Sequence, residues 1–483
     1  MRIALLSSSK RSQDIFGGFK FAAPLMPSMG ILQIAAHLEK NNHHDVFVYD
    51  ADLMNCLREE QILEWIGQKK PDLIGISIFT NHVDTSQKLL HRIKNEFPTL
   101  PVIGGGPHCT IDYQAAFQEL PLDYVGVGEG DETMTELVEA LNQQRPLDSV
   151  LGLAYKANGE IKFTGPRPLI KDLDSMPYPA YHLIKEYIPL IRPQIMGYKK
   201  KPLLLIISSR GCPHSCGFCS NHLLWGGKYR AHSAQYLVDM IEHFISQFGI
   251  KEITFFDDSF ILNKKRVLAF CDLLQERKLK IYWSANINLN NVSDEVVARM
   301  RQAGCWYVST GVESGNNDIL QFIGKPLTVE TATEKLQILH RNKINCRGYF
   351  ILGLPKDTKE TINDTIRFVL NNPLYLLHLT VYTIQKGTPW YSENEKYGTV
   401  FYEHNDGMSG TLAGNIHGLS FVGHGLSADY LLQTQNQVYK KFYLRFSQVL
   451  KMLKSISTLD DVIKMVKFFG AGFYFVVKSK LIK

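Results

Sequence analysis

The sequence of 483 residues predicts an α/β protein with two parallel-stranded domains. Short apolar strands alternate with helical stretches through residues 1–145, and they do so again through residues 201–392. Between these regions the alternation lapses and prolines accumulate. The chain is also too long for one ordinary core. We therefore expect two domains, a linker over 146–200 and a small, mainly helical region over 393–483.

The first domain is predicted to be a doubly wound parallel sheet. Helical stretches separate its strands, for example residues 30–38 and 86–93. Ligands of such sheets bind beyond the carboxyl ends of the strands, and small polar residues and glycines collect at three of those ends. The five predicted strands cover residues 3–6, 46–49, 73–77, 101–103 and 124–127.

The linker opens with a predicted hairpin at residues 152–162 and continues with four prolines, Pro166, Pro168, Pro177 and Pro179. Proline at this spacing favours extended chain.

The second domain is predicted to be a partial barrel of six βα units, (β/α)6, shorter than the closed eight-unit form. In parallel barrels the reacting groups lie at the carboxyl ends of the strands. The six predicted strands cover residues 203–207, 252–257, 280–287, 306–312, 346–353 and 376–384.

Three cysteines follow the first of these strands, in the segment Cys212-Pro-His-Ser-Cys216-Gly-Phe-Cys219. Thiolates are soft ligands that hold iron–sulfur clusters or zinc. Three thiolates leave one iron of a four-iron cluster open for chemistry. Zinc bound with His214 or His222 is an alternative. A third is that these cysteines are free, as the scattered spacing of the others suggests (Cys56, Cys109, Cys271, Cys305 and Cys346).

The pattern CxxxCxxC after a strand, with an aromatic residue before the last cysteine, resembles the signature of the radical S-adenosylmethionine (radical SAM) family. The resemblance implies that Cys212, Cys216 and Cys219 hold a 4Fe–4S cluster. It also implies that the open iron binds the methionine moiety of S-adenosylmethionine, which is split to a 5′-deoxyadenosyl radical.

Other strand ends match the same family. The resemblance implies that Asp257, Asp258, Glu313 and Gly353 hold S-adenosylmethionine, since carboxylates accept hydrogen bonds from ammonium and ribose hydroxyl groups and glycine lets adenine approach the backbone. Taken singly, Asp257 and Glu313 are equally well explained as helix caps or ion-pair partners. The usual Gly-Leu-Pro-Gly-Glu-Thr is here Gly353-Leu-Pro-Lys-Asp-Thr358, a departure that leaves this turn open.

Residues 1–145 resemble the cobalamin-binding domain of one branch of the family. The matching segments include Pro71–Ser77, Gly105–His108 and Gly128–Gly130. The resemblance implies that four residues line the corrin and its nucleotide tail, namely Thr80, Gly105, Gly106 and Glu129. The loop of residues 7–21 contains no histidine, so we expect cobalt to lack a lower histidine ligand, which suits methyl transfer. The alternative is an empty docking domain.

By resemblance, the function is that of a cobalamin-dependent radical SAM enzyme, a methyltransferase acting on an unactivated carbon. An oxidative cyclase or ring-contraction enzyme of a hydrophobic substrate, such as a tetrapyrrole or lipid, is the alternative. A non-catalytic cobalamin or redox sensor is a hypothesis of another class. The expected partners are a small-molecule substrate and an external electron donor of the flavodoxin or ferredoxin type. The substrate and oligomeric state are not determined by the sequence.

Composition places the protein in the cytoplasm. No run of eighteen apolar residues is present, and eight unpatterned cysteines favour a reducing compartment. The net charge is +6, and residues 436–483 hold nine Lys and one Arg against two Asp, which is +8. We expect these charges to be solvated helix faces, with no nucleic acid bound. Peripheral membrane contact of this basic region, including the apolar segment 468–477, is the alternative.

Overall fold

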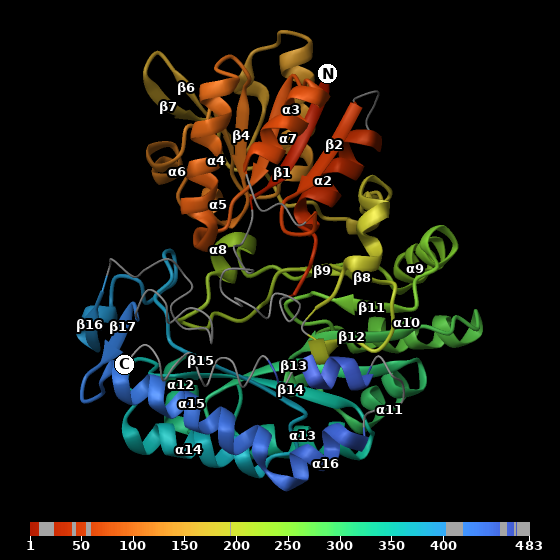
Figure 1. The fold of residues 1–483 in the computed structure, drawn as a ribbon, viewed down its shortest axis with the longest axis vertical. Helices are drawn as coiled ribbons and strands as arrows, with labels where there is room; N and C mark the ends of the chain where they lie inside the picture. Colours follow the sequence, from red (N-terminus) through yellow and green to blue (C-terminus); the bar gives the residue numbers. More distant parts are fainter. Residues whose placement is uncertain are drawn as a thin grey trace. The chain divides into compact units, whose positions relative to one another are not determined.

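The structure is a computed structural model. It describes residues 1–8, 24–40, 45–54, 59–193, 195–401, 419–454, 461–467 and 470. The loop at residues 9–21 and most of the segment 468–477, both subjects of predictions, lie outside these ranges. The chain divides into two compact units, one mainly Leu25–Ile191 and the other mainly from Arg192 onward (Figure 1).

The first unit is a sheet covered by helices on both faces (Figure 1). Its first five strands are parallel, in the order β2-β1-β3-β4-β5. The apolar run Ile3–Leu6 of the interior strand β1 is fully buried, as a strand covered on both faces requires. The strands are β1 (Arg2–Ser7), β2 (Asp45–Asp50), β3 (Leu73–Ser77), β4 (Val102–Gly105) and β5 (Tyr124–Gly126). The helices are α2 (Met29–Lys40), α3 (Glu59–Lys69), α4 (Val83–Glu96), α5 (Pro107–Ile111), α6 (Tyr113–Glu119) and α7 (Gly130–Asn142).

The predicted hairpin forms, as β6 (Leu153–Ala157) and β7 (Glu160–Phe163). β6 pairs antiparallel with β5, so the hairpin extends the sheet past the boundary predicted at residue 145. Hydrophobic alternation alone does not reveal such pairing, because a hairpin has the same pattern alone or at a sheet edge.

The second unit is built on a six-stranded parallel sheet in the order β15-β14-β13-β12-β11-β8. The strands are β8 (Leu203–Ile206), β11 (Glu252–Phe255), β12 (Tyr282–Ile287), β13 (Cys305–Glu313), β14 (Asn345–Leu352) and β15 (Leu376–Val381). The intervening helices are α9 (Ala234–Phe248), α10 (Lys264–Glu276), α11 (Asp294–Gln302), α12 (Asn317–Phe322), α13 (Val329–Arg341) and α14 (Lys359–Asn371). The predicted fold class is confirmed in both units.

The C-terminal region covers the edge strand β15 of this sheet. It contains α15 (Ala428–Leu444), α16 (Phe446–Lys454) and a short antiparallel pair, β16 (Gly398–Val400) and β17 (Phe421–Gly423). The Tyr439 hydroxyl accepts from Leu379 N at 2.8 Å and donates to Leu379 O at 3.1 Å. The Tyr443 hydroxyl does the same at Leu377, 3.1 Å each way. These contacts occupy backbone groups that the edge strand β15 would otherwise expose.

No helix in the described ranges is both long and apolar enough to traverse a lipid bilayer.

Candidate active site

The cysteine loop follows β8 at the carboxyl edge of the sheet, between β9 (Ser209–Arg210) and α8 (Asn221–Trp225). The backbone N–H of Gly217 donates to Ile323 O at 3.0 Å, and that of Cys219 donates to Cys216 O at 3.0 Å. Asn288 Nδ2 lies 3.0 Å from His214 Nε2. The loop is therefore tied to the segments that follow α12 and β12.

Gly217 sits between two of the cysteines because no other residue fits there. A Cβ atom at this position would lie 2.1 Å from Cε2 of Trp390. The Trp390 ring is itself stacked on Phe322 with 5.1 Å between ring centroids. The loop thus packs directly on an aromatic pair.

The three thiols are partly buried. Burial raises the pKa of each, that of Cys216 to about 11, and the nearby Lys325 ammonium lowers the pKa of Cys212 and Cys216. In the described part of the chain, no three His, Cys, Asp or Glu side chains are gathered closely enough to hold a metal ion. The donor set nevertheless fits a cluster, because three thiols lie on one loop and the Lys325 cation favours the thiolate forms of Cys212 and Cys216.

Glu313 and Lys325 form an ion pair beside this loop. Lys325 Nζ lies 3.1 Å from Glu313 Oε1, and both side chains are largely buried. Glu313 ends β13 with a φ of 72°, and its carboxylate fills the space over Gly311, where a Cβ would lie 2.0 Å from Oε1. Lys325 is not among the residues predicted from the sequence. A single lysine after a helix carries no pattern that distinguishes it from a solvated one.

Asp257 lies beneath the start of the cysteine loop, where it is 1 % exposed. Its carboxylate accepts from Ser208 N at 2.6 Å and from Ser209 Oγ at 2.8 Å. Arg266 donates to Ser208 O at 3.0 Å and stands close enough to lower the pKa of Asp257, which burial raises more strongly. The geometry makes Asp257 an anchor of the strand end from which the loop departs.

Asp258 is exposed and faces the loop. Partial desolvation of its carboxyl group raises the pKa of Asp258, whereas hydrogen bonds from the Asn221 side chain and the Gly211 backbone lower it. Its charge also raises the pKa of Cys212 and Cys219. Gly353 follows β14 with a φ of 73°, and a Cβ there would lie 3.0 Å from Leu431 on α15.

In the first unit, three of the four residues predicted to bind cobalamin meet at the carboxyl edge of the sheet. Ile78 N donates to Gly105 O at 2.8 Å, and a Cβ on Gly106 would lie 2.9 Å from Ile78 O. Thr80 Oγ1 lies 3.4 Å from His108 Nδ1. A Cβ on Gly105 would meet nothing within 4 Å, so the backbone is open to close approach at this position.

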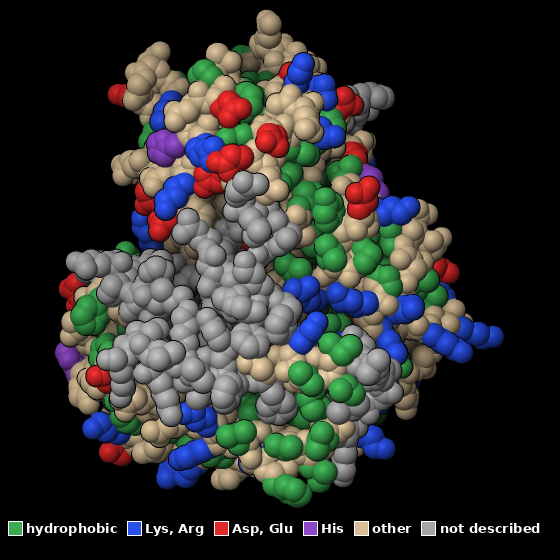
Figure 2. All heavy atoms as spheres, viewed as in Figure 1, with side chains coloured by type: hydrophobic (Ala, Val, Ile, Leu, Met, Phe, Trp, Pro, Cys, Tyr) green, Lys and Arg blue, Asp and Glu red, His purple; other side chains and the backbone are tan. Residues whose placement is uncertain are grey.

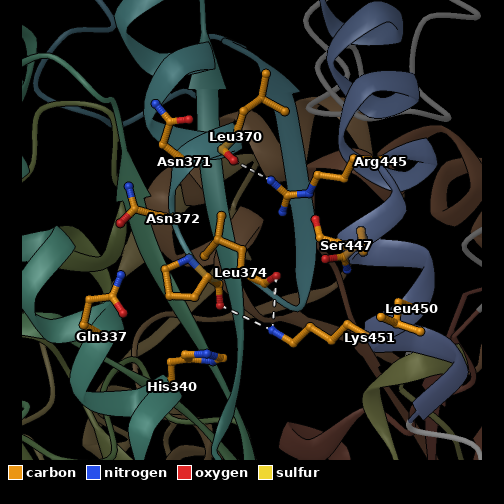
Figure 3. Close-up of a pocket in the computed structure, with 12 residues that line it drawn as sticks. Gln337, His340, Leu370, Asn371, Asn372, Leu374, Arg445, Ser447, Leu450 and Lys451 are labelled. Carbon is orange, nitrogen blue, oxygen red and sulfur yellow. Dashed lines mark hydrogen bonds between the residues drawn. The ribbon is translucent and has the colours of Figure 1, made fainter.

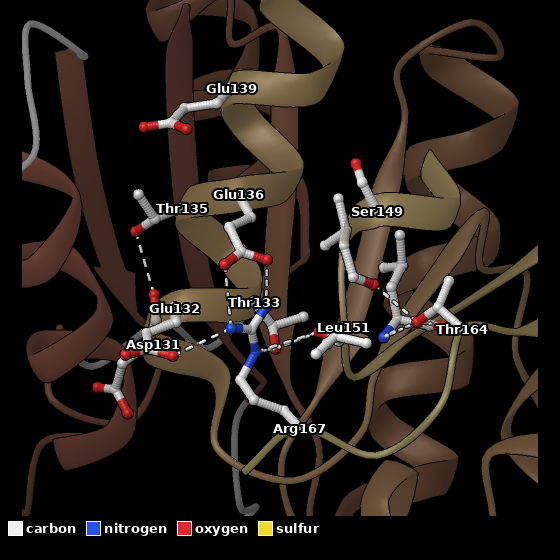
Figure 4. A network of polar contacts seen from close by, with 12 residues as sticks. Asp131, Glu132, Thr133, Thr135, Glu136, Glu139, Ser149, Leu151, Thr164 and Arg167 are labelled. Atoms are coloured by element: carbon white, nitrogen blue, oxygen red, sulfur yellow. Dashed lines mark hydrogen bonds and ion pairs between the residues drawn. The ribbon is translucent and has the colours of Figure 1, made fainter. Parts of the chain in front are cut away.

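Glu129 stands at the start of α7, where it is buried and accepts from Ile170 N at 2.8 Å. Arg167 holds the neighbouring turn of α7 (Figure 4). Its guanidinium donates to Thr133 Oγ1 at 2.9 Å and to Glu132 Oε2 at 3.0 Å, and it also pairs with Glu136. These contacts fix the connecting segment against the first two turns of α7.

Comparison with known proteins identifies both units. Residues 22–138 match the B12 binding domain, and residues 206–369 match the model of the radical SAM superfamily. An uncharacterized methyltransferase of Pyrococcus horikoshii is 33 % identical over 363 residues, covering 75 % of this chain and 77 % of that protein. The chain belongs to the radical SAM superfamily.

A further relative and a solved structure are also similar to this chain. The anaerobic magnesium-protoporphyrin IX monomethyl ester cyclase of Rubrivivax gelatinosus is 29 % identical over 385 residues, which cover 77 % of this chain and 66 % of that protein. The structure of the cobalamin-dependent radical enzyme OxsB with aqua-cobalamin bound has the same fold, with a TM-score of 0.74 at 18 % identity, covering 98 % of this chain and 72 % of that one.

This radical SAM protein is therefore an enzyme, and the alternative of a non-catalytic sensor is set aside. A 4Fe–4S cluster, S-adenosylmethionine and cobalamin are the cofactors of its two matched domains, which decides between the cluster and zinc.

Proposed function

We propose that this chain transfers a methyl group to an unactivated carbon of a small-molecule substrate. The similarity to a relative named as a methyltransferase supports this, together with a cysteine loop at the carboxyl edge of the sheet. When bound, the cluster with S-adenosylmethionine supplies a 5′-deoxyadenosyl radical and cobalamin supplies the methyl group. We add that the enzyme works in the cytoplasm with a flavodoxin- or ferredoxin-type electron donor.

The residues proposed to bind the cluster are thiolates, and those proposed to bind the methionine end of S-adenosylmethionine are a carboxylate and an ammonium group. Cys212, Cys216 and Cys219 supply thiolates to the cluster. Glu313 and Lys325, 3.1 Å apart, offer an acceptor for an ammonium group and a donor for a carboxylate, as the zwitterionic methionine end requires. An ion pair already made in the protein keeps both charges paired before the ligand enters, which limits their desolvation cost.

Three further residues complete this site. Asp258 reaches the loop from the end of β11 and is proposed to accept hydrogen bonds from S-adenosylmethionine. Asp257 is proposed to contribute by positioning Ser208 and Ser209 at the base of the loop. Gly353 is proposed to let adenine approach the backbone after β14.

For cobalamin we propose Thr80, Gly105, Gly106 and Glu129. The glycines leave the edge of the sheet without side chains, and Thr80 offers a hydroxyl beside them. The domain boundaries at residues 200 and 392 also remain proposals, whereas the hairpin of β6 and β7 continues the first sheet beyond the boundary predicted at residue 145.

An oxidative cyclisation is the second candidate, favoured by the similarity to the magnesium-protoporphyrin ester cyclase. The mass of the product separates the two. A gain of one methylene unit supports methyl transfer, and a change in hydrogen or oxygen content without added carbon supports cyclisation.

The cluster assignment is tested by anaerobic reconstitution. We expect about four irons and four sulfides per chain, loss of both in Cys216→Ala, and 5′-deoxyadenosine only from the unaltered chain. The buried Cys271→Ala is the matched control, and it should retain the iron. Zinc at full occupancy, or unchanged iron in Cys216→Ala, would contradict the assignment.

A further inference from the structure

A cationic pocket lies at the amino ends of the strands of the second sheet, whereas the cysteine loop lies at their carboxyl ends. It has a volume of about 590 Å³ and lies where α13, the end of α14 and α16 meet (Figure 3). Pro373 and Leu374, which precede β15, line it, so it opens at the amino ends of the parallel strands. Arg445, Lys451 and His340 also line it, and none of its described lining residues is acidic.

The charges in this pocket have no acidic partner among the described lining residues. Lys451 Nζ lies 3.4 Å and 3.5 Å from two backbone carbonyls and 5.7 Å from the centroid of the Tyr375 ring, and one Arg445 nitrogen donates to Leu370 O. Arg445 Nε and Asn372 Oδ1 are buried with no hydrogen-bond partner among the described residues. Burial, and then the charge of Lys451, lower the pKa of His340. A group with several anionic oxygens would accept hydrogen bonds from Arg445 Nε and Lys451 Nζ.

Beside the pocket, α16 presents an apolar face to solvent. Phe446 is 82 % exposed, Leu453 is 50 % exposed and Leu450 is 37 % exposed. The spacing of these residues, at i, i+4 and i+7, places them on one face of the helix. The preceding Leu444 is 68 % exposed. On the other face Gln448 and Met452 are buried against the sheet.

Exposed apolar side chains are concentrated around this helix. Of the fifteen large hydrophobic residues that are exposed in the described ranges, seven fall between Leu444 and Val466. Figure 2 shows green side chains gathered with blue ones where Figure 1 places α16. Single exposed apolar residues need no explanation, but a cluster of this kind marks an interaction surface.

The charge around this face identifies its partner. Residues 430–459 contain four Lys and one Arg but neither Asp nor Glu. A second copy docking by the same face would bring these like charges together. An anionic lipid surface complements both features, since it offers phosphates at the depth of the cations and acyl chains below them.

We propose that α16 and its pocket form a docking surface for an anionic membrane. Phe446, Leu450 and Leu453 enter the boundary between headgroups and acyl chains, and a headgroup phosphate enters the pocket of Arg445 and Lys451. Docking at the amino ends of the strands leaves the cysteine loop, at their carboxyl ends, open to its ligands. The proposal does not depend on which reaction the enzyme catalyses.

Cosedimentation of the full chain with vesicles tests the surface. We expect binding to phosphatidylcholine vesicles containing phosphatidylglycerol, weak binding to phosphatidylcholine alone, and loss of binding at high salt. Phe446→Ser combined with Leu453→Ser should lower partitioning by about tenfold, and Lys451→Gln by about fivefold. Leu190→Ser and Lys265→Gln, exposed residues elsewhere, are the matched controls and should bind normally.

Several outcomes would overturn the proposal. One is equal binding to both kinds of vesicle at any salt concentration. Another is a full chain that does not bind either kind of vesicle, even if inorganic phosphate raises its melting temperature. A dimer in light scattering that Phe446→Ser converts to a monomer, with no vesicle binding, would assign the face to a second copy. A melting temperature unchanged in the variants excludes misfolding as the cause of lost binding.

Discussion

At the scale of single residues, Lys356 occupies a backbone conformation that favours glycine. Its φ is 70°, in the turn that follows β14. Its ammonium lies 4.3 Å from the centroid of the Phe322 ring, so the side chain gains a cation–π contact there. The turn left open by the sequence thus forms with a lysine where the family pattern has glycine.

We expect Lys356→Gly to be more stable than Lys356→Ala by about 1 kcal/mol. Both variants lose the cation–π contact, but only glycine adopts the left-handed backbone without strain. The two free energies of unfolding in urea measure the difference. Equal values would show that the turn relaxes to another conformation.

Asp357 closes the same turn from a buried position. It accepts from Leu354 N at 3.0 Å and from Thr361 Oγ1 at 2.6 Å, and burial raises its pKa from 3.8 to about 6. Because the folded state favours the protonated acid, this contribution to stability is full below pH 3.8 and is lost as the pH rises through 6.

In the unaltered chain this group should therefore lower the free energy of unfolding by about 2–3 kcal/mol between the two pKa values. Asp357→Asn cannot ionise, so it should lack this part of the pH dependence. Urea unfolding of both proteins across this range gives the difference. Curves that run parallel would mean that the carboxyl is already ionised throughout.

At the scale of elements, the cysteine loop keeps its shape through what it packs on. Gly217 lets the loop lie against Trp390, while Asp257 and Arg266 hold the strand end from which it starts. The contacts come from the segments after β11 and β15 and from α10, so the position of the thiols depends on the assembled sheet.

Gly217→Ala should lower the iron content after reconstitution, because the added methyl group has no space beside the indole ring. For the same reason it should lower the free energy of unfolding by about 1–3 kcal/mol. Adding Trp390→Leu should restore much of the iron, since it removes the obstructing ring. Iron analysis and thermal unfolding of the single and double variants measure both effects. An unchanged iron content in Gly217→Ala would show that the loop moves freely off the ring.

At the scale of the whole molecule, each unit has its own sheet and core. The buried cluster of the first unit includes Leu6, Ile76 and Val125, whereas Phe255, Phe270 and Trp283 pack on one another in the second. Because each unit has its own core, we expect that a substitution in one unit can abolish its cofactor site without affecting the cofactor site of the other.

Cys216→Ala should keep cobalamin at about one per chain while losing the cluster. Gly105→Val should do the reverse, with cobalamin affinity reduced about tenfold or more, because a Cβ atom at this position enters open space at the carboxyl end of β4, where cobalamin is proposed to bind. Cobalt and iron analysis of the two variants measures this. Loss of both cofactors in either variant would contradict independent sites.

The two α/β units, most of their strands along the chain and the loop with the three cysteines could all be predicted from the sequence. Runs such as Leu203–Ile206 are short, apolar and separated by helical spacing, and those local patterns persist in the folded chain. Motif spacing also led to the family, since ligand spacing within one loop is a local property.

The residues that surround that loop could not be predicted from the sequence, because they come from separate segments of the chain. Lys325 pairs with Glu313 because the segments after β13 and α12 meet, and Asp257 lies under the loop because β11 is the neighbour of β8. The same holds for the pocket at Arg445 and Lys451, which is formed by segments a hundred residues apart in sequence. Long-range packing sets these neighbours, and no local pattern in the chain encodes it.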